Sequence, residues 1–570
     1  MGAKASYEAK PWVKFYQPGV RADIDVPPQS LPQLFDEATT TYRDHTAVIF
    51  YGKKISYATL RDHADRLANA LSDLGLKKGD RVALYLLNSP QFIIAYFAVL
   101  KIGGTVTPIS PVYTSFEIKF QLENSDAKAL ICQDILYDKV EKAGVKLQQV
   151  IVTNIGEYLP VMRRLFGKAF LGDASGEIGG RGARNIEGVH RFQDLIKKYP
   201  PNPPAISIDP KTDIAALPYT GGTTGHPKGV MLTHYSLVAA LAAGTAVYNY
   251  EKGKEVVIAF LPFFHIFGQV VIMLGGLSQG QTLVVFTTPD TASILEAVEK
   301  YRATIFLGVP TLYEYLKDHK DTAKVNWKRL KLILCGADTL HESTVSGWRK
   351  RTQSSITEGY GLTECCAASH LNPVDRPKVG SFGVPIPNMM AAVIDPDGTA
   401  FLPVGEIGEL VLKGPMLMQG YWKNPEETKA SFLEVDGERW LRTGDLVRMD
   451  EEGYFHYYDR RKDLIKHRGY SVFAKDIEDV LYTHPQIKGA GVIGVPDPAE
   501  GSVIKAIVVL QPEARGRVGE EEIRKFCQER LAHYKVPKLI EFRGELPKTD
   551  VGKVSRRELR DEGAREARPR

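Results

Sequence analysis

The 570-residue sequence has few cysteines, and none of them forms a Cys-x-x-Cys pair: Cys132, Cys335, Cys365, Cys366 and Cys527. An odd number of unpaired cysteines argues against a disulfide framework and against a structural zinc site. The sequence also has no basic stripe, because the net charge is only +5 and the two signs are interspersed. This argues against a partner nucleic acid. Most of the excess positive charge follows residue 459, where it suits either a polyanionic ligand or a solvated surface.

A secretory signal is not expected, because the N-terminal residues MGAKASYEAKPWVKFY contain no apolar core. The longest apolar stretch, residues 256–277, could span a bilayer by length, but Pro262, His265, Gly268 and Gln269 interrupt it. Polar groups in the middle of a bilayer are costly. We therefore predict a buried strand, a loop and a buried helix, in a cytoplasmic protein or one peripheral to the inner face of a membrane.

Helical and strand patterns alternate in the first part of the chain, which is long enough for several domains. Apolar residues at helical spacing predict helices over residues 60–76 and 92–101. Short apolar runs predict strands at 81–87, 106–109, 129–132, 149–153, 255–260, 282–286, 304–307 and 332–335. This alternation predicts an α/β fold with parallel-rich sheets covered by helices.

The pattern changes after residue 380, where short strands are separated by Gly, Pro and Asp-Gly turns. A helix at 476–483, strands at 490–494 and 504–510 and a helix at 520–532 then predict a small α+β unit. We expect a large domain over residues 1–458, with a β-rich subdomain from about 380 to 458, and a small mobile domain over 459–570.

Residues 156–190 resemble an insertion. The first part, IGEYLPVMRRLFGKAFLG, places apolar residues on one helical face and Arg163, Arg164 and Lys168 roughly opposite. The pattern fits a surface helix packed on the body of the protein. It also fits a basic amphipathic contact with a membrane through residues 156–175.

A glycine- and threonine-rich segment, TGGTTGHPK, carries the clearest chemical signal. Its residues are Thr220, Gly221, Gly222, Thr223, Thr224, Gly225 and, three positions later, Lys228. Glycines let several backbone N–H groups point into one concavity, threonine hydroxyls add donors, and the lysine adds a charge that can reach a phosphate. The segment is not a Walker A loop, because it does not end in Gly-Lys-Ser/Thr. It predicts a polyphosphate site.

This segment resembles the phosphate loop of the acyl-adenylate-forming superfamily, which includes acyl-CoA synthetases, beetle luciferases and peptide-synthetase adenylation domains. Further segments resemble motifs of that superfamily in the same order: LPFFHIFG (261–268), EGYGLTE (358–364), GELVLKGPMLMQGYW (408–422), RTGDL (442–446), DRRKDLIKHRGYSV (459–472) and LPKTDVGKVSRREL (546–559). They span most of the chain. We therefore expect a member of this superfamily.

The resemblance implies an ATP site made of the phosphate loop and a second group of residues: Gly336, Ala337, Glu358, Gly359, Tyr360, Gly361, Thr363, Asp445 and Arg460. Tyr360 would stack on adenine and Asp445 would accept hydrogen bonds from the ribose hydroxyls. Arg460 would reach the ribose or a phosphate. Glu364, with Thr220 nearby, would hold the Mg²⁺ that bridges the phosphates.

The resemblance also implies two reaction states. Lys553 would bridge the substrate carboxylate and the α-phosphate during adenylation, where a cation stabilises the developing charge. Rotation of the small domain about Lys462 would then bring Lys466, Arg468 and Gly469 to the site for thioester formation. His265 fits either the acyl pocket or a buried core histidine.

The predicted reaction joins a carboxylic acid to CoA at the expense of ATP, through an acyl-AMP. Gly221, which stands where the superfamily commonly has Ser, favours a long-chain fatty acid, as do the N-terminal KPWVKFYQPGV and the insertion. A medium-chain or aryl-acid ligase is the alternative within the superfamily. A non-catalytic acyl- or nucleotide-binding transport partner is the alternative from a different class. The sequence makes no prediction of the oligomeric state.

Overall fold

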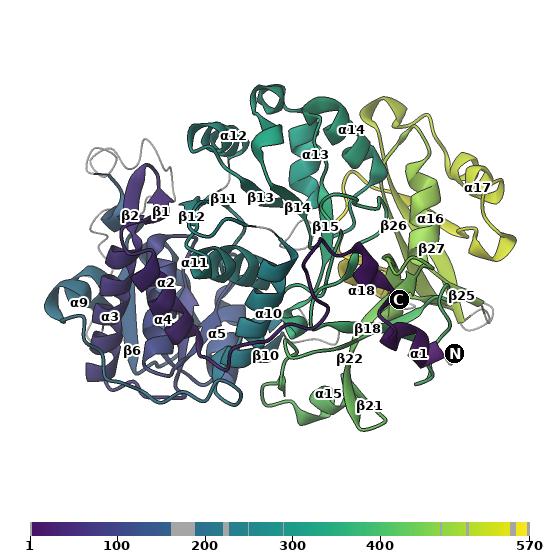
Figure 1. Cartoon of the computed structure of the whole chain (residues 1–570). Coiled ribbons are helices and arrows are strands. Elements are labelled where there is room, and N and C mark those ends of the chain that lie inside the picture. Colours follow the sequence, from purple (N-terminus) through teal and green to yellow (C-terminus); the bar gives the residue numbers. More distant parts are fainter. Residues whose placement is uncertain are drawn as a thin grey trace. The chain divides into compact units, whose positions relative to one another are not determined.

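The computed structural model describes residues 3–160, 189–220, 227–248, 250–288, 290–467, 470–497, 501–547 and 554–566. Its internal contacts divide the chain into two compact units. The larger unit contains Lys10–Met390 and Leu412–Leu441, and the second unit contains Met1–Ala9, Ala391–Val411 and Arg442–Arg570. Figure 1 labels many of their helices and strands. The domain boundary at residue 459 stays a prediction.

The first sheet of the larger unit has the strand order β17-β16-β15-β14-β13-β11-β12-β1-β2. All neighbours from β15 to β1 run parallel, whereas β16, β17 and β2 pair antiparallel at the two edges. The bounds are β1 Thr46–Phe50, β2 Lys53–Ser56, β11 Val256–Ala259, β12 Thr282–Val285, β13 Ile305–Gly308, β14 Leu332–Cys335, β15 Thr357–Tyr360, β16 His370–Leu371 and β17 Val384–Pro385.

The second sheet of the larger unit has the order β20-β10-β8-β4-β3-β5-β6-β7, and β9 pairs with β10. Strands β8, β4, β3, β5, β6 and β7 run parallel, and β9, β10 and β20 add antiparallel pairs. The bounds are β3 Arg81–Tyr85, β4 Thr105–Pro108, β5 Ala127–Gln133, β6 Gln149–Thr153, β7 Val189–Arg191, β8 Ile214–Ala216, β9 Tyr219–Thr220, β10 Lys228–Thr233 and β20 Gly420–Tyr421.

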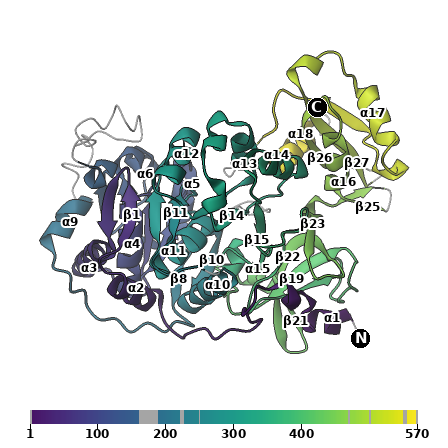
Figure 2. The same cartoon turned by 45° about the horizontal axis from the view of Figure 1, so that its top comes forward.

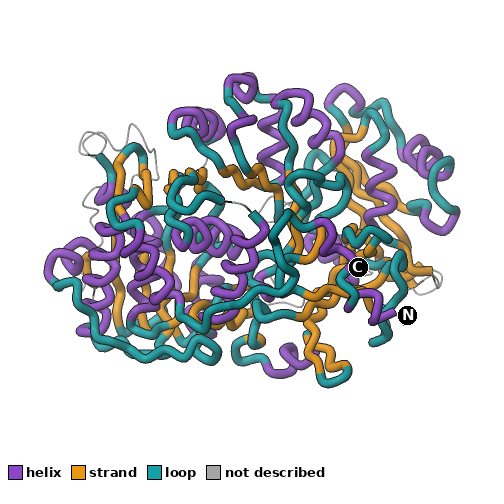
Figure 3. The backbone as a smooth tube through the Cα atoms, viewed as in Figure 1, coloured by secondary structure: helices purple, strands orange, loops and turns teal. Residues whose placement is uncertain are grey.

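Helices flank the strands of both sheets (Figure 3). Their bounds are α2 Leu31–Thr41, α3 Tyr57–Asp73, α4 Pro90–Lys101, α5 Ser115–Asn124, α6 Tyr137–Ala143, α9 Phe192–Lys198, α10 His234–Val247, α11 Gly275–Ser278, α12 Thr291–Lys300, α13 Pro310–Asp318, α14 Glu342–Thr352 and α15 Pro425–Ala430. Side-chain caps explain where several begin: Ser56 accepts from the N–H of Thr59 at the start of α3, and Ser89 accepts from the N–H of Phe92. Helix α4 is apolar on all sides and buried from Pro90 to Leu100, as expected of a helix inside a core.

The structure confirms the α/β fold class, and most predicted elements agree within two or three residues. The apolar stretch 256–277 forms β11, a loop, a π-helix over Phe267–Leu274 and α11. In the part of the chain that the structure describes, no helix has both the length and the apolar character needed to cross a bilayer. The predicted helix 520–532 is wrong at its end, because α17 covers Glu520–Gln528 and Leu531 instead packs against the core of the second unit.

The second unit ends in a sheet of order β25-β24-β27-β26, with β28 on β27. The bounds are β24 Ile465–His467, β25 Tyr470–Val472, β26 Ile487–Asp497, β27 Gly501–Leu510 and β28 Leu539–Phe542, with helices α16 Ala474–Tyr482, α17 Glu520–Gln528 and α18 Arg556–Glu566. Figure 2 shows these helices beside β26 and β27. Ile477, Val492, Ala506 and Ile523 belong to one buried apolar cluster.

A further sheet has the order β18-β19-β22-β21, and β23 pairs with β22. The bounds are β18 Met390–Ile394, β19 Gly408–Lys413, β21 Phe432–Val435, β22 Glu438–Met449 and β23 Phe455–Arg460. These antiparallel pairings match the predicted β-rich region. The N-terminal helix α1 covers Ala3–Glu8.

The predicted insertion begins inside the core. Tyr158 and Leu159 are buried, and the hydroxyl of Tyr158 lies 2.7 Å from Nδ1 of His63 in α3. Residues 161–188, which include the predicted basic face, lie outside the described residues. The membrane contact therefore stays a prediction that no longer involves Tyr158 and Leu159.

Candidate active site

The carboxyl ends of β14 and β15 bring together residues predicted to bind ATP. Gly336 follows β14, and Glu358, Gly359 and Tyr360 belong to the neighbouring parallel strand β15. A Cβ on Gly336 would lie 3.4 Å from the carbonyl oxygen of Gly359. Ala337 follows with a φ of 73°. Ligands of open α/β sheets bind at this end of the strands, so the position suits a nucleotide.

The ring of Tyr360 packs in an aromatic cluster. Its centroid lies 4.6 Å from that of Phe382 and 5.9 Å from that of His370, and the latter two rings contact each other edge-on at 5.0 Å. Burial lowers the pKa of His370 to about 3, so this ring is neutral. The N–H of Ser369 donates to the carbonyl of Tyr360 at 2.9 Å. Tyr360 is thus held in one orientation before any ligand arrives.

Glu358 is a buried carboxyl group in this strand. Burial raises its pKa to about 7, against a hydrogen bond from the backbone of Leu340 that lowers it. Burial also raises the pKa of the neighbouring Cys335. Near neutral pH, Glu358 is therefore partly protonated and able to donate a hydrogen bond. The sequence pattern alone did not reveal this property.

The chain turns sharply between Tyr360 and Glu364. A Cβ on Gly361 would lie 1.7 Å from the carbonyl oxygen of Ala367, so only glycine fits this close approach. Cys366 and Ala367 adopt φ values of 56° and 88°. Thr363 and Glu364 lie in the 3-10 turn Thr363–Cys365 between these points, so the turn fixes where the predicted metal-binding carboxylate emerges.

Two contacts tie Glu364 to the segment before α15. The N–H of Met418 donates to the carbonyl of Glu364 at 2.8 Å, and the hydroxyl of Tyr421 donates to Oε1 of Glu364 at 2.8 Å. Burial, and after it the charge of Glu364, raises the pKa of Tyr421, so Tyr421 keeps its proton and remains a donor. Tyr421 lies in the family motif at 408–422, but the sequence pattern did not indicate a role for it.

The ends of the phosphate loop form a hairpin. Thr220 of β9 pairs with Lys228 of β10 in antiparallel register. Gly221, Gly222, Thr223, Thr224 and Gly225 lie outside the described residues. Lys228, predicted to reach a phosphate, forms an ion pair with Glu427 of α15, and its ammonium lies 5.1 Å from the ring centroid of Tyr421.

His265 lies in a loop that a buried asparagine holds. The side chain of Asn88 donates to the carbonyl of Leu261 at 2.8 Å and accepts from the N–H of Phe263 at 2.7 Å. Nδ1 of His265 accepts from the N–H of Phe267 at 3.3 Å, where the π-helix starts. Such helices are frequent at functional sites. Asn88 follows a predicted strand, and that position was the only signal for it in the sequence.

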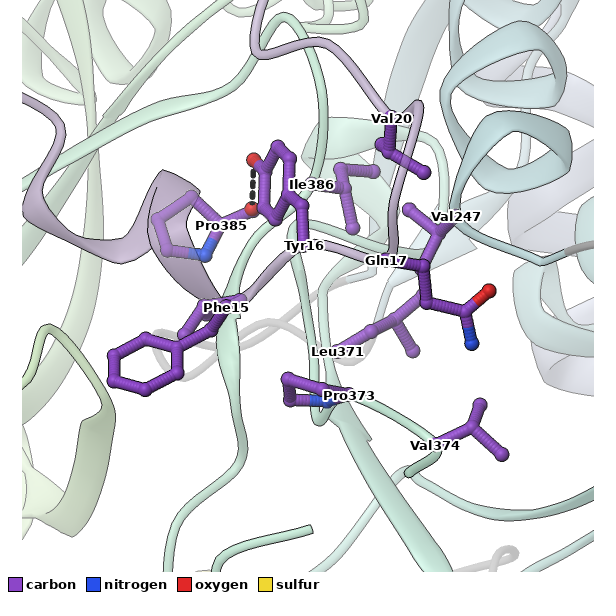
Figure 4. A pocket seen from close by; sticks show the side chains of 11 residues that line it. Phe15, Tyr16, Gln17, Val20, Val247, Leu371, Pro373, Val374, Pro385 and Ile386 are labelled. Atoms are coloured by element: carbon purple, nitrogen blue, oxygen red, sulfur yellow. Dashed lines mark hydrogen bonds between the residues drawn. The ribbon is translucent and has the colours of Figure 1, made fainter. Parts of the chain in front are cut away.

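An apolar pocket of the larger unit, shown in Figure 4, lies beside β16 and β17. Its lining residues are Phe15, Tyr16, Gln17, Val20, Val247, Leu371, Pro373, Val374, Val384, Pro385 and Ile386. The hydroxyl of Tyr16 donates to the carbonyl of Pro385, and the N-terminal segment continues to Ile24, whose N–H donates to Asn388. The lining carries no charged side chain, so the pocket does not resemble a phosphate site. The segment covers the edge strand β17.

In the second unit, the predicted ribose ligand Asp445 faces Arg460. The two residues are register partners in β22 and β23, and Nε of Arg460 lies 3.4 Å from Oδ1 of Asp445. The preceding residues of β22 are held by Glu409, which is 1% exposed. Glu409 accepts from Arg442 at 2.5 Å and from the N–H of Gly444 at 3.1 Å. The sequence placed Glu409 in a motif but assigned it no role.

The segment predicted to be a hinge lies beside a buried ion cluster. Nη1 of Arg556 lies 2.6 Å from Oδ1 of Asp459 and 3.6 Å from Asp463, and Nε donates to Glu478 at 3.0 Å. Asp459 is fully buried. The backbone of Lys462 lies in the 3-10 turn Arg461–Asp463 and that of Lys466 in β24. Arg468, Gly469 and Lys553 lie outside the described residues.

These features place the predicted nucleotide site of an α/β protein at the carboxyl ends of parallel strands. The pattern described as "AMP-binding enzyme" matches residues 35–422, and that described as "AMP-binding enzyme C-terminal domain" matches residues 476–553. The chain belongs to the AMP-binding enzyme family. This result confirms the resemblance seen in the sequence.

Relatives of known function match almost the whole chain. A long-chain-fatty-acid–CoA ligase of Bacillus subtilis (strain 168) is 37% identical over 97% of this chain and 98% of its own length. One of Escherichia coli O6:H1 is 36% identical over the same shares. Among solved structures, ATP-bound MatB from Rhodopseudomonas palustris has a TM-score of 0.81 at 29% identity, covering 94% of this chain and 99% of its own. These matches confirm the prediction of an acyl-CoA ligase.

Proposed function

We propose that the protein activates a long-chain fatty acid with ATP, releases pyrophosphate and transfers the acyl group from acyl-AMP to CoA. The similarity along the full chain to long-chain-fatty-acid–CoA ligases, 37% identical to the Bacillus subtilis protein, carries this proposal. The non-catalytic binder loses its support, because the similarity covers 97% of the chain. The medium-chain or aryl-acid alternative differs only in the substrate acid.

In this proposal the residues around β14 and β15 bind the nucleotide. Tyr360, held by Phe382 and His370, stacks on adenine, and the backbone of Gly336 approaches it closely. The residues of the phosphate loop that ends at Thr220 and Lys228 enclose the phosphates. Asp445 accepts hydrogen bonds from the ribose. These roles rest on the position of each residue in a family motif and on the geometry above.

The two side chains that the family motifs assign to the metal, Glu364 and Thr220, fit Mg²⁺. A carboxylate and the hydroxyl of Thr220 are oxygen ligands of the kind Mg²⁺ prefers, and Mg²⁺ is usually held by one or two carboxylates plus substrate phosphates. Across the described residues, no cluster of three or more His, Cys, Asp or Glu side chains could form a complete cage, which agrees with a metal that arrives with ATP. When bound, Mg²⁺ neutralises phosphate charge.

Catalysis then consists of positioning and electrostatic stabilisation. The fatty acid carboxylate attacks the α-phosphate, and Lys553 stabilises the charge that develops between them. The CoA thiol next attacks the acyl carbon and AMP leaves. Lys462 is the proposed pivot between the two states, and Lys466, Arg468 and Gly469 face the site in the second. His265 is the proposed lining of the acyl pocket. We also retain a cytoplasmic location, with peripheral membrane contact through the part of residues 156–175 that follows Leu159.

The test is CoA-dependent release of AMP by the purified protein with a series of acids. Palmitate and oleate should give the highest kcat/KM, octanoate less and benzoate least, because each buried methylene adds binding energy. A maximum at octanoate or benzoate would replace the long-chain substrate by the alternative. No AMP release with any acid would reject the ligase.

A further inference from the structure

A row of contacting side chains connects helix α15 to Glu364 within the larger unit. Glu427 of α15 pairs with Lys228, the ammonium of Lys228 lies 5.1 Å from the ring centroid of Tyr421, and the hydroxyl of Tyr421 donates to Glu364 at 2.8 Å. The members come from β10, β20, α15 and the turn after β15. No family motif considered above assigns a role to Tyr421 or Glu427.

Tyr421 and Lys228 are shielded from solvent, whereas Glu427 is partly exposed. Tyr421 is 8% exposed, and the side chains of Lys228 and Glu427 are 13% and 35% exposed. Hydrogen bonds to a charged carboxylate are stronger than neutral ones, and shielding from water strengthens them further. A hydroxyl donated to one carboxylate oxygen therefore restricts the rotation of Glu364.

The backbone reinforces the same arrangement. Tyr421 and Gly420 pair with Val230 and Met231 of β10, and the N–H of Tyr421 donates to the hydroxyl of Thr428 in α15 at 2.8 Å. A Cβ on Gly420 would lie 2.5 Å from Cγ2 of Thr428. Helix α15 consequently packs against β20 at a distance that only glycine allows, which brings Glu427 within reach of Lys228.

We infer that Tyr421 is a positioning residue for the metal-binding carboxylate of Glu364, and that Lys228 and Glu427 hold the Tyr421 ring in the required orientation. Partners of a metal-binding carboxylate orient it, and their loss typically weakens metal binding about 10- to 100-fold. The inference rests on the proposed role of Glu364. In this inference the ammonium of Lys228 pairs with the carboxylate of Glu427 rather than with a phosphate.

The test compares Tyr421→Phe with the wild type in the full-length chain. This variant removes only the hydroxyl. We expect the Mg²⁺ concentration for half-maximal pyrophosphate release to rise about 10-fold or more, while kcat at saturating Mg²⁺ recovers to within about threefold. The affinity for Mn²⁺ in the presence of ATP and no acid, measured by electron paramagnetic resonance, should fall by the same factor.

Tyr57→Phe is the matched control. It also removes a buried hydroxyl that donates a hydrogen bond, in this case to the carbonyl of Gln281 at 2.7 Å, outside the candidate site. Its metal dependence should equal that of the wild type. Unchanged Mn²⁺ affinity in Tyr421→Phe would overturn the inference even if the ligase activity were established. If the wild type bound Mn²⁺ with ATP but activated no acid, the proposed ligase activity would be rejected. The Mn²⁺ affinity of Tyr421→Phe would still test the positioning role of Tyr421.

Two further variants test the second half of the inference. Lys228→Met and Glu427→Gln should both raise the half-maximal Mg²⁺ concentration, by about 3-fold each, because both loosen the Tyr421 ring. If Lys228 instead binds a phosphate, Lys228→Met alone would weaken ATP binding at saturating Mg²⁺. Glu427→Gln would then have no effect, and this result would overturn the assignment of Lys228.

Discussion

Arg556 neutralises buried carboxylates of the second unit, and its loss has a calculable effect. The guanidinium contacts Asp459 at 2.6 Å, and Asp459 has no exposed side-chain surface. It also contacts Glu478, whose side chain is 12% exposed. In Arg556→Met both carboxylates lose their cation. Removing one partner of a buried ion pair costs about 3–5 kcal/mol, a large part of the stability of a domain of this size.

The composition of the two units provides an assay that separates them. Cys527 is buried in the core of the second unit, and the other cysteines and all five tryptophans belong to the larger unit. Burial raises the pKa of Cys527 to about 11, so its thiol should react with a maleimide only after local opening. In Arg556→Met, Cys527 should therefore be labelled at least about a hundredfold faster, because each 1.4 kcal/mol is about tenfold. The rate is read by peptide mass spectrometry, and tryptophan fluorescence should be unchanged.

Arg524→Met is the control, because Arg524 pairs with the largely exposed Glu521 in the same unit and exposed pairs contribute about 0–1 kcal/mol.

Burial already raises the pKa values of Asp459 and Glu478, and Arg556 lowers them. Without Arg556 their folded-state pKa values rise further, so the destabilisation should grow as the pH rises. Equal labelling rates for the two variants, or a larger effect at low pH, would refute the reasoning.

Two further predictions concern the candidate site, and a third concerns Glu157 outside it. Lys553→Ala should reduce palmitate-dependent pyrophosphate release by about a hundredfold or more but leave thioester formation from supplied palmitoyl-AMP within about threefold; normal pyrophosphate release would remove Lys553 from the mechanism. Burial raises the pKa of Glu358 from 4.5 to about 7, so the wild-type folded state loses stability as the pH rises through this window. Glu358→Gln should therefore be more stable than the wild type at pH 8, by at most about 3 kcal/mol, and equally stable near pH 4. Burial likewise raises the pKa of Glu157 to about 7. Glu157→Gln should therefore show the same pH dependence of stability, without any change in the KM for ATP. If each variant had the same unfolding curve relative to the wild type at pH 4 and pH 8, both stability predictions would be rejected.

Elements made of buried apolar runs were predictable from the sequence. Strand β14 was predicted as residues 332–335 and forms there, because parallel strands buried on both faces are continuous apolar runs. The predicted helix 92–101 begins two residues earlier, at Pro90, because Ser89 caps it. Apolar runs and helix caps depend only on residues that are neighbours in the chain, so they can be recognised from the sequence alone.

Long-range side-chain partners were not predictable. Tyr421 and Glu364 are 57 positions apart, and Asn88 reaches a loop more than 170 positions away. Their polar atoms meet only because β10, β20 and the turn after β15 pack together. The raised pKa of Glu358 likewise comes from burial in the folded chain. The motif placed Glu364 and Glu358 at the candidate site, whereas the residue that orients Glu364 and the burial that favours protonation of Glu358 required the structure.

The most direct test of the central claim is the exchange of labelled pyrophosphate into ATP by the purified protein without CoA. Exchange should require both palmitate and Mg²⁺, and adding CoA should convert the palmitate to palmitoyl-CoA with one AMP released per thioester. Exchange that does not depend on any carboxylic acid, or palmitoyl-CoA formed with release of ADP, would contradict an acyl-AMP pathway.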